Sequence, residues 1–170
     1  MTGSRQLTAL FSLLLAGTSC EGPAGGPTCA PFDPAKYQAS GTPSFRADIQ
    51  PLLAVSCALS TACHGVDRGA GPQHKPFLGP KVGVAPDAPM LSAIRSDLLG
   101  PAERAPRLAR VHPGRPGESF LLHKLEGRQS CPGVECPQGC GTRMPMVGDP
   151  LSPAEITTIR DWILQGAQDN

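Results

Sequence analysis

Apolar positions along this chain recur at helical spacing. Those at 45, 49, 52 and 53 share one helical face, and Pro51 is tolerated near a helix start, so we expect a helix from Asp48, as its N-cap, to Cys57. Similar spacing predicts helices at 89–99 and 116–125, each followed by a glycine. We find no alternation typical of strands. The pattern therefore predicts a small all-α domain with long loops.

The C-terminal helix has the clearest local signals. Ser152 and Glu155 have the spacing of a capping box, and Pro153 occupies the first helical position. An apolar stripe then follows on one face, and Gly166 ends the helix. The stripe consists of Ile156, Ile159, Trp162 and Ile163. We expect these side chains to lie in the core.

Composition narrows the class of protein. The chain has 20 glycines and 20 prolines among 170 residues, about twice the roughly 12% of average usage. Its length fits one domain, and its few aromatic residues leave a core that disulfides, a metal or a large cofactor would help to stabilise. With 15 basic and 14 acidic residues the net charge is +1. No basic surplus indicates nucleic acid as a partner.

The first 19 residues follow the plan of a secretory signal peptide, with Arg5, an apolar run and small residues before Cys20. This arrangement resembles a bacterial lipobox, which implies cleavage before Cys20 and a lipid anchor on it. An ordinary secretory signal is the alternative. We expect a signal peptide at 1–19, a flexible tether at 20–43 and a folded domain at 44–168. The protein would then lie in the cell envelope, as a periplasmic or outer-membrane-anchored lipoprotein, or be secreted.

A cysteine–histidine motif carries the most chemical information. Two thiols, Cys57 and Cys63, precede His64. This set suits covalent haem, because the thiols add to the vinyl groups and the histidine then lies under the iron. The usual spacing is Cys-x-x-Cys-His, whereas five residues separate Cys57 from Cys63, and Ser60 stands where the first cysteine usually lies. A second axial ligand must come from a distant loop, and Met144 lies 80 residues beyond His64.

Further blocks surround these residues in a particular order. Residues 48–53 lead into Cys63-His64-Gly65, residues 113–125 follow, and Arg143-Met144-Pro145 precedes the capped helix. In this order, over about residues 44–167, the chain resembles the class I cytochrome c family. It is most similar to the bacterial exported members that have long inserts between the haem motif and the methionine.

The resemblance implies one covalent haem c, with His64 as proximal and Met144 as distal ligand, and single-electron exchange with redox partner proteins. The long spacing leaves three states open. Both Cys57 and Cys63 attach haem; only Cys63 does; or the two form a disulfide in a haem-free interaction lipoprotein on a degenerate cytochrome c fold. A copper-handling lipoprotein is a second alternative, and its soft ligands would be Cys57, Cys63, His64, Met144 and Met146.

Several residues compete for roles at such a site. Met146, His112 and His123 are rivals of Met144 as distal ligand, and Arg110 and Arg143 are candidates to pair with haem propionates. An iron with two axial protein ligands has no open position. We also find no Ser/His/Asp set, no phosphate-binding glycine loop and no pair of carboxylates at a spacing typical of catalysis. We therefore expect an electron carrier and not an enzyme.

The remaining cysteines are Cys29, in the predicted tether, and Cys131, Cys136 and Cys140 in the domain. In an exported chain they are expected to form disulfides, for which four cysteines allow three pairings. A zinc site is a weaker alternative, because zinc ribbons usually contain Cys-x-x-Cys pairs and none occurs here. A disulfide close to Met144 would stiffen the loop that presents its sulfur.

Overall fold

Helices dominate the structure, a computed structural model that describes residues 29–30, 41–66, 76–80 and 83–170. In chain order the described elements are the wide turn η2 (Phe45–Ile49), α1 (Gln50–Cys57), β1 (Gly65–Val66), β2 (Gly79–Pro80), α2 (Ala88–Leu99), the short turn η3 (Pro116–Glu118), α3 (Phe120–Glu126) and α4 (Pro153–Leu164). The prediction of a small all-α domain is confirmed. The predicted signal peptide, Cys20 and most of the tether lie outside the described residues.

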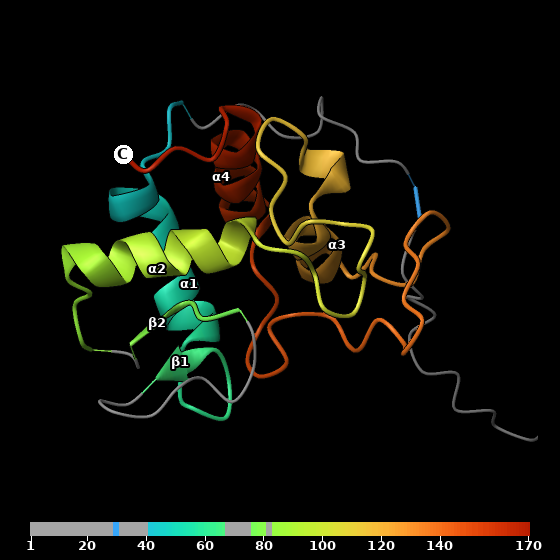
Figure 1. The fold of residues 1–170 in the computed structure, drawn as a ribbon, viewed down its shortest axis with the longest axis horizontal. Coiled ribbons are helices and arrows are strands. Elements are labelled where there is room, and N and C mark those ends of the chain that lie inside the picture. Colours follow the sequence, from blue (N-terminus) through green and yellow to red (C-terminus); the bar gives the residue numbers. More distant parts are fainter. Residues whose placement is uncertain (1–28, 31–40, 67–75, 81–82) are drawn as a thin grey trace, which may run out of the picture.

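Long loops connect the helices (Figure 1). Helix α2 crosses α1, and the loop that leads into α4, drawn in orange, runs below α3 in this view. The last residue of the chain lies beside η2, where Asn170 accepts a hydrogen bond from the Arg46 N–H at 3.0 Å. None of the helices in the described part has the length and apolar character that crossing a bilayer requires.

Helix α4 begins as its sequence predicts. Ser152 Oγ accepts a hydrogen bond from the Glu155 N–H, and the Glu155 carboxylate accepts one from the Ser152 N–H. The apolar stripe is buried, and the Trp162 ring stacks on Phe45 with 5.4 Å between ring centroids. Helix α4 therefore packs against η2 and joins the two ends of the domain.

The start of the first helix differs from the prediction. The cap is Ser44 and not Asp48, because Ser44 Oγ accepts from the Ala47 N–H while the Asp48 carboxylate accepts from the Ser44 N–H. The first turn is wide, with the Ile49 N–H bonded to the Ser44 carbonyl. Pro51 then lies in the first turn of α1, where its missing N–H costs little.

A small strand pair is present although the sequence shows no strand pattern. β1 and β2 are parallel and two residues long, with Gly65 opposite Gly79. Gly65 also lies close to the end of α1, because a Cβ added there would lie 2.6 Å from the Ala58 carbonyl oxygen. The predicted helix at 116–125 likewise divides into η3 and α3, which ends at Gly127 in the left-handed conformation.

The core lies where these elements meet. Its fully buried side chains come from η2, α1, α2, α3 and α4, and they surround Trp162. The largest are Phe45, Ile49, Leu53, Leu78, Ile94, Leu98, Leu125, Ile159 and Ile163. A smaller cluster, formed around Phe120 with Ala102 and Ala105, packs under the loop between α2 and η3.

Candidate cofactor-binding site

A cavity of about 870 Å³ lies next to the core. Its lining is mostly apolar and comes from the end of α1, residues 59–64, the loop after α2, helix α3 and residues 141–147. Cofactor and ligand sites in proteins commonly have this size and this mixture of apolar walls with a few polar groups. It is therefore large enough for an organic cofactor.

The residues that the sequence singles out meet at this cavity. Cys57, Cys63, His64, Met144 and Met146 all contribute to its lining. They come from two stretches of chain, which we name the thiol–histidine segment (residues 57–64) and the methionine loop (residues 136–147). The fold thus brings together side chains that are far apart in the sequence.

The rival histidines lie elsewhere. His112 and His123 are absent from the cavity lining. His112 Nδ1 lies 3.2 Å from the Pro113 carbonyl oxygen, and His123 Nε2 lies 3.0 Å from the carbonyl oxygen of Gly117. Neither imidazole lines the cavity that contains the thiols.

The long spacing of the motif is accommodated by a closed loop. The His64 N–H donates to the Cys57 carbonyl at 3.1 Å, which brings the second half of the thiol–histidine segment back to the end of α1. The N–H groups of Cys63 and Gly65 both donate to the Ser60 carbonyl. Ser60 therefore shapes the loop with its backbone, and both cysteines reach the cavity in spite of the five residues between them.

The two cysteines of this segment are free thiols. Burial, followed by the nearby Cys63, raises the pKa of the Cys57 thiol to about 12. Cys57 therefore stays neutral at physiological pH. Cys63 is more accessible, and the Ser60 hydroxyl lies 3.8 Å from its sulfur.

The orientation of His64 is set by a backbone contact. His64 Nδ1 lies 2.9 Å from the Pro76 carbonyl oxygen, which can only accept a hydrogen bond. A proton on Nδ1 satisfies this contact, and in a neutral ring Nε2 is then the unprotonated nitrogen. Metal-binding histidines are commonly oriented in this way by a carbonyl group.

The methionine loop is held by helix α3. The Met144 N–H donates to the Lys124 carbonyl at 3.0 Å, and the side chain packs against the edge of the core. Met146 is 70% exposed. Of the two methionine sulfurs at the cavity, that of Met144 therefore has the more constrained position.

The four remaining cysteines form two disulfides, Cys29–Cys131 and Cys136–Cys140. The prediction of disulfides is confirmed, and this pairing is one of the three that were open. Because the sulfurs of Cys131, Cys136 and Cys140 are bonded to other sulfurs, they supply no thiolates for zinc. The described residues also contain no cluster of three metal-ligating side chains of His, Cys, Asp or Glu.

The lining also includes two cations, Arg104 and Lys124, to which the sequence analysis assigns no role at the site. Lys124 is buried, and its Nζ donates to the carbonyl groups of Cys140, at 2.9 Å, and of Thr142. Burial, followed by Arg104, lowers the pKa of Lys124 to about 8. The sequence contains a signal for the burial of Lys124. It follows Phe120 by four residues and so lies on the apolar face of the predicted helix.

The two arginines considered in the sequence have other partners. Arg143 is not part of the lining, and its Nε donates to the Leu125 carbonyl at 2.9 Å. Arg110 does line the cavity, but its guanidinium donates to the Asp97 carbonyl and lies 3.5 Å from a Glu103 carboxylate oxygen. The loop residue Arg104 and the helix residue Lys124 therefore replace them as the notable cations of the site.

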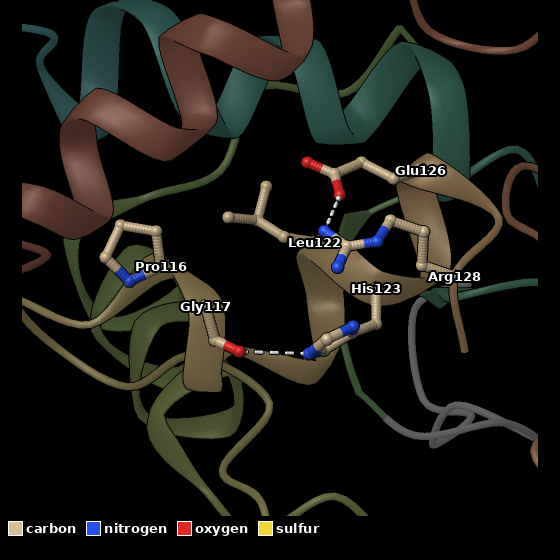
Figure 2. Close-up of a pocket in the computed structure, with 6 residues that line it drawn as sticks. All are labelled: Pro116, Gly117, Leu122, His123, Glu126 and Arg128. Atoms are coloured by element: carbon tan, nitrogen blue, oxygen red, sulfur yellow. Dashed lines mark hydrogen bonds and ion pairs between the residues drawn. The ribbon is translucent and has the colours of Figure 1, made fainter. Parts of the chain in front are cut away.

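Figure 2 shows a second, much smaller pocket, lined by residues of α3 that do not line the large cavity, among them Leu122 and His123. His123 points toward the Gly117 carbonyl there, and Arg128 pairs with Glu126 at 3.1 Å. Burial is the main cause that lowers the pKa of His123. The space measures about 10 Å³, the room that one water molecule needs. It is too small for a cofactor.

No protein-family model and no curated protein matches the sequence. Among solved structures, a chain described as Kuenenia stuttgartiensis hydrazine synthase is similar at 24% identity with a TM-score of 0.44. The match covers 74% of this chain and 16% of that chain. This protein thus corresponds to a small part of that longer one, and the likeness is a distant one.

Proposed function

We propose that this protein is an exported electron carrier, similar to c-type cytochromes, that binds one covalent haem in the large cavity. The observation that supports this most is the meeting of two thiols, one imidazole and one thioether at a single mostly apolar cavity. These are the groups that hold haem c in proteins. They come from Cys57, Cys63, His64 and Met144.

The residues present fit such a group. A volume of about 870 Å³ accommodates a macrocycle, and both thiols are free to form thioethers. His64 Nδ1 lies 2.9 Å from the Pro76 carbonyl oxygen, the kind of contact that orients metal-binding histidines. These features favour haem over a copper ion, which needs the same soft ligands but no cavity of this volume. They also favour haem over the haem-free alternative, in which Cys57 and Cys63 would be joined.

Each residue would have a distinct task. Cys57 and Cys63 would attach the macrocycle, His64 would be the proximal ligand, and the soft sulfur of Met144 would be the distal one and raise the potential. Bound haem supplies one iron that changes between the ferrous and ferric states. Apolar side chains such as Leu98 and Phe120 would exclude water from it. With His64 and Met144 both holding the iron, such a site would exchange electrons and would leave no position for a substrate.

The proposal includes a membrane anchor and redox partners. Cys20, which lies outside the described residues, would carry a lipid anchor to the membrane, and redox partner proteins would exchange electrons with the domain. The net charge of +1 supplies no strong field to steer a partner. Labelling with a radioactive fatty acid tests the anchor, because Cys20→Ala should abolish incorporation if the lipobox interpretation is right.

The experiment for haem is a pyridine haemochrome spectrum of denatured protein, produced in an exporting host with cytochrome c maturation genes. Covalent haem should survive denaturation in the unmodified protein. The band position distinguishes one thioether from two, so Cys57→Ala and Cys63→Ala show which thiols are used. Absence of haem, in a host that loads a control cytochrome, would overturn the proposal.

Two methionine variants test the distal ligand. Met144→Ala should remove the sulfur-to-iron charge-transfer band at the red end of the ferric spectrum. Met146→Ala is the matched control, since it removes a thioether that lines the same cavity but is 70% exposed. Loss of the band in the control, and not in Met144→Ala, would reverse the assignment.

A further inference from the structure

One part of the cavity wall holds two positive charges close together. Arg104 comes from the loop after α2, and Lys124 comes from α3. Both reach Gly141 of the methionine loop, where an added Cβ would lie 3.3 Å from Lys124 Nζ and 3.6 Å from Arg104 Nε. Two cations from distant parts of the chain thus converge on one glycine at the cavity.

Lys124 has capacity for a further hydrogen bond. Its side chain is 8% exposed, and its ammonium group has three N–H donors, two of which are directed at the carbonyl groups of Cys140 and Thr142. Arg104 donates through Nη1 to the Gly139 carbonyl at 3.3 Å, which leaves the other donors of its guanidinium. The two side chains are therefore anchored by the methionine loop and keep donors for a ligand.

Among the described residues, neighbouring cations have acidic partners and these two do not. Arg107 pairs with Glu135 at 2.9 Å, and Arg110 lies 3.5 Å from Glu103. Within the part of the chain that the structure describes, no carboxylate lies within ion-pair distance of Lys124 or Arg104. The mutual repulsion is consistent with the lowered pKa of Lys124.

Such an arrangement favours an anionic ligand. Two like charges at a mostly apolar cavity are unfavourable by themselves, and an anion that contacts both offsets this cost. A carboxylate accepts charge-assisted hydrogen bonds from an ammonium group and from a guanidinium. The rest of the lining is mostly apolar, and its other charged pair, Arg110 and Glu103, lies 3.5 Å apart. The complementary ligand is therefore a mostly apolar body with carboxylate groups at one edge.

We propose that Lys124 and Arg104 receive the carboxylate groups of the cavity's ligand, which for haem are its two propionates. This inference rests on the proposed function and adds an orientation to it, with the carboxylate edge against Gly141. It also makes Lys124 a positioning residue for Met144. The Lys124 ammonium group holds the carbonyls of Cys140 and Thr142, and its own carbonyl accepts from the Met144 N–H.

The test uses the haem-loaded full chain and three neutralising variants. Lys124→Met and Arg104→Gln remove one cation each, and Arg107→Gln is the matched control, because Arg107 lies on the same loop, pairs with Glu135 and does not line the cavity. The readouts are the propionate bending bands in the resonance Raman spectrum and the midpoint potential. Loss of a nearby cation stabilises the ferric state relative to the ferrous one, because ferric iron carries one more positive charge, so the potential should fall.

We expect shifted propionate bands and a lower potential in Lys124→Met and Arg104→Gln, and neither change in Arg107→Gln. Lys124→Met should in addition weaken the sulfur-to-iron band, and Lys124→Arg should restore the propionate bands. If Lys124→Met does not mature, Arg104→Gln carries the test, because Arg104 is an exposed loop residue.

The outcomes separate this inference from the proposed function. No haem in the unmodified chain overturns the proposed function. Haem in the unmodified chain, with propionate bands in both variants identical to those of Arg107→Gln, overturns the assignment of Lys124 and Arg104 alone. A fall in thermal stability without a change in the bands would mean that Lys124 only supports the methionine loop, and this too overturns the assignment.

Discussion

The thiol–histidine segment and the methionine loop line the same cavity but are held in different ways. The first continues directly from α1, whose residues Ile49 and Leu53 are fully buried in the core. The second has no helix or strand of its own and depends on the Cys136–Cys140 disulfide and on hydrogen bonds to Lys124. One wall is therefore held by apolar packing, and the other by a covalent bond and polar contacts.

This difference has a consequence for the two proposed ligands. His64 follows a packed helix by a few residues, so its position should change only when the core is disturbed. Met144 should respond to changes in single bonds of its loop that leave the core intact. The comparison predicts that unfolding free energy reports on the first wall and ligand spectroscopy on the second.

The largest effect is expected from Leu53→Ala, which leaves a cavity under α1. Because Leu53 is fully buried, the unfolding free energy should fall by about 2–5 kcal/mol. Denaturant unfolding measures this, with Val55→Ala, at a position 59% exposed, as the control on the same helix. Equal losses in both variants would contradict the view that core packing holds this wall.

The next effect is expected from replacing Cys136 and Cys140 together by serine. The disulfide closes a loop with a sequence separation of 4, for which chain entropy predicts a loss of about 2 kcal/mol. The sulfur-to-iron band should weaken at the same time, because the loop before Met144 gains freedom. A band unchanged in position and intensity would show that the hydrogen bonds to Lys124 suffice to hold the loop.

A smaller effect is expected from Gly141→Ala. Gly141 has a φ of +69°, and Gly133, with a φ of +92° and open space around it, is the matched control. Each alanine should cost about 1 kcal/mol in unfolding free energy, because both residues are left-handed. Only Gly141→Ala should also disturb Lys124 and Arg104, so the two variants should differ in the propionate bands and not chiefly in stability.

The smallest effect concerns pH and His123 in the smaller pocket. Burial lowers the pKa of His123 from its usual 6.5, so the unfolded chain binds a proton at a higher pH than the folded one does. The contribution of His123 to stability is therefore present above pH 6.5 and decreases as the pH falls below it. Unfolding curves between pH 7 and about 5 measure this, and His123→Gln should show a flatter profile. Identical profiles would mean that His123 titrates alike in both states.

Much of the helical structure could be predicted because its causes are local. The capping box at Ser152 and the apolar stripe to Ile163 determine α4, and Gly127 ends α3 in the way that its sequence indicates. The start of α1 was predicted less well. Both Ser44 and Asp48 are good capping residues, and the C-terminal residue Asn170 decides between them by accepting a hydrogen bond from the Ser44 hydroxyl.

The candidate site was likewise predictable only in part. The chemical identity of Cys63, His64 and Met144 could be read from the sequence, since the motif and the order of blocks are properties of the chain alone. That these residues meet at one cavity, that Cys57 reaches it across a five-residue spacing, and that the charged pair is Arg104 and Lys124 depended on contacts between distant segments. No local pattern encodes such contacts.

The sequence by itself therefore determined the helices, the capping box of α4 and the list of chemically capable side chains, because spacing and capping act within a few residues. The tertiary structure decided the disulfide partners, the β1–β2 pair and the distribution of charge around the cavity. Those features depend on long-range packing, in which a glycine such as Gly65 or Gly141 matters for what approaches it from elsewhere in the chain.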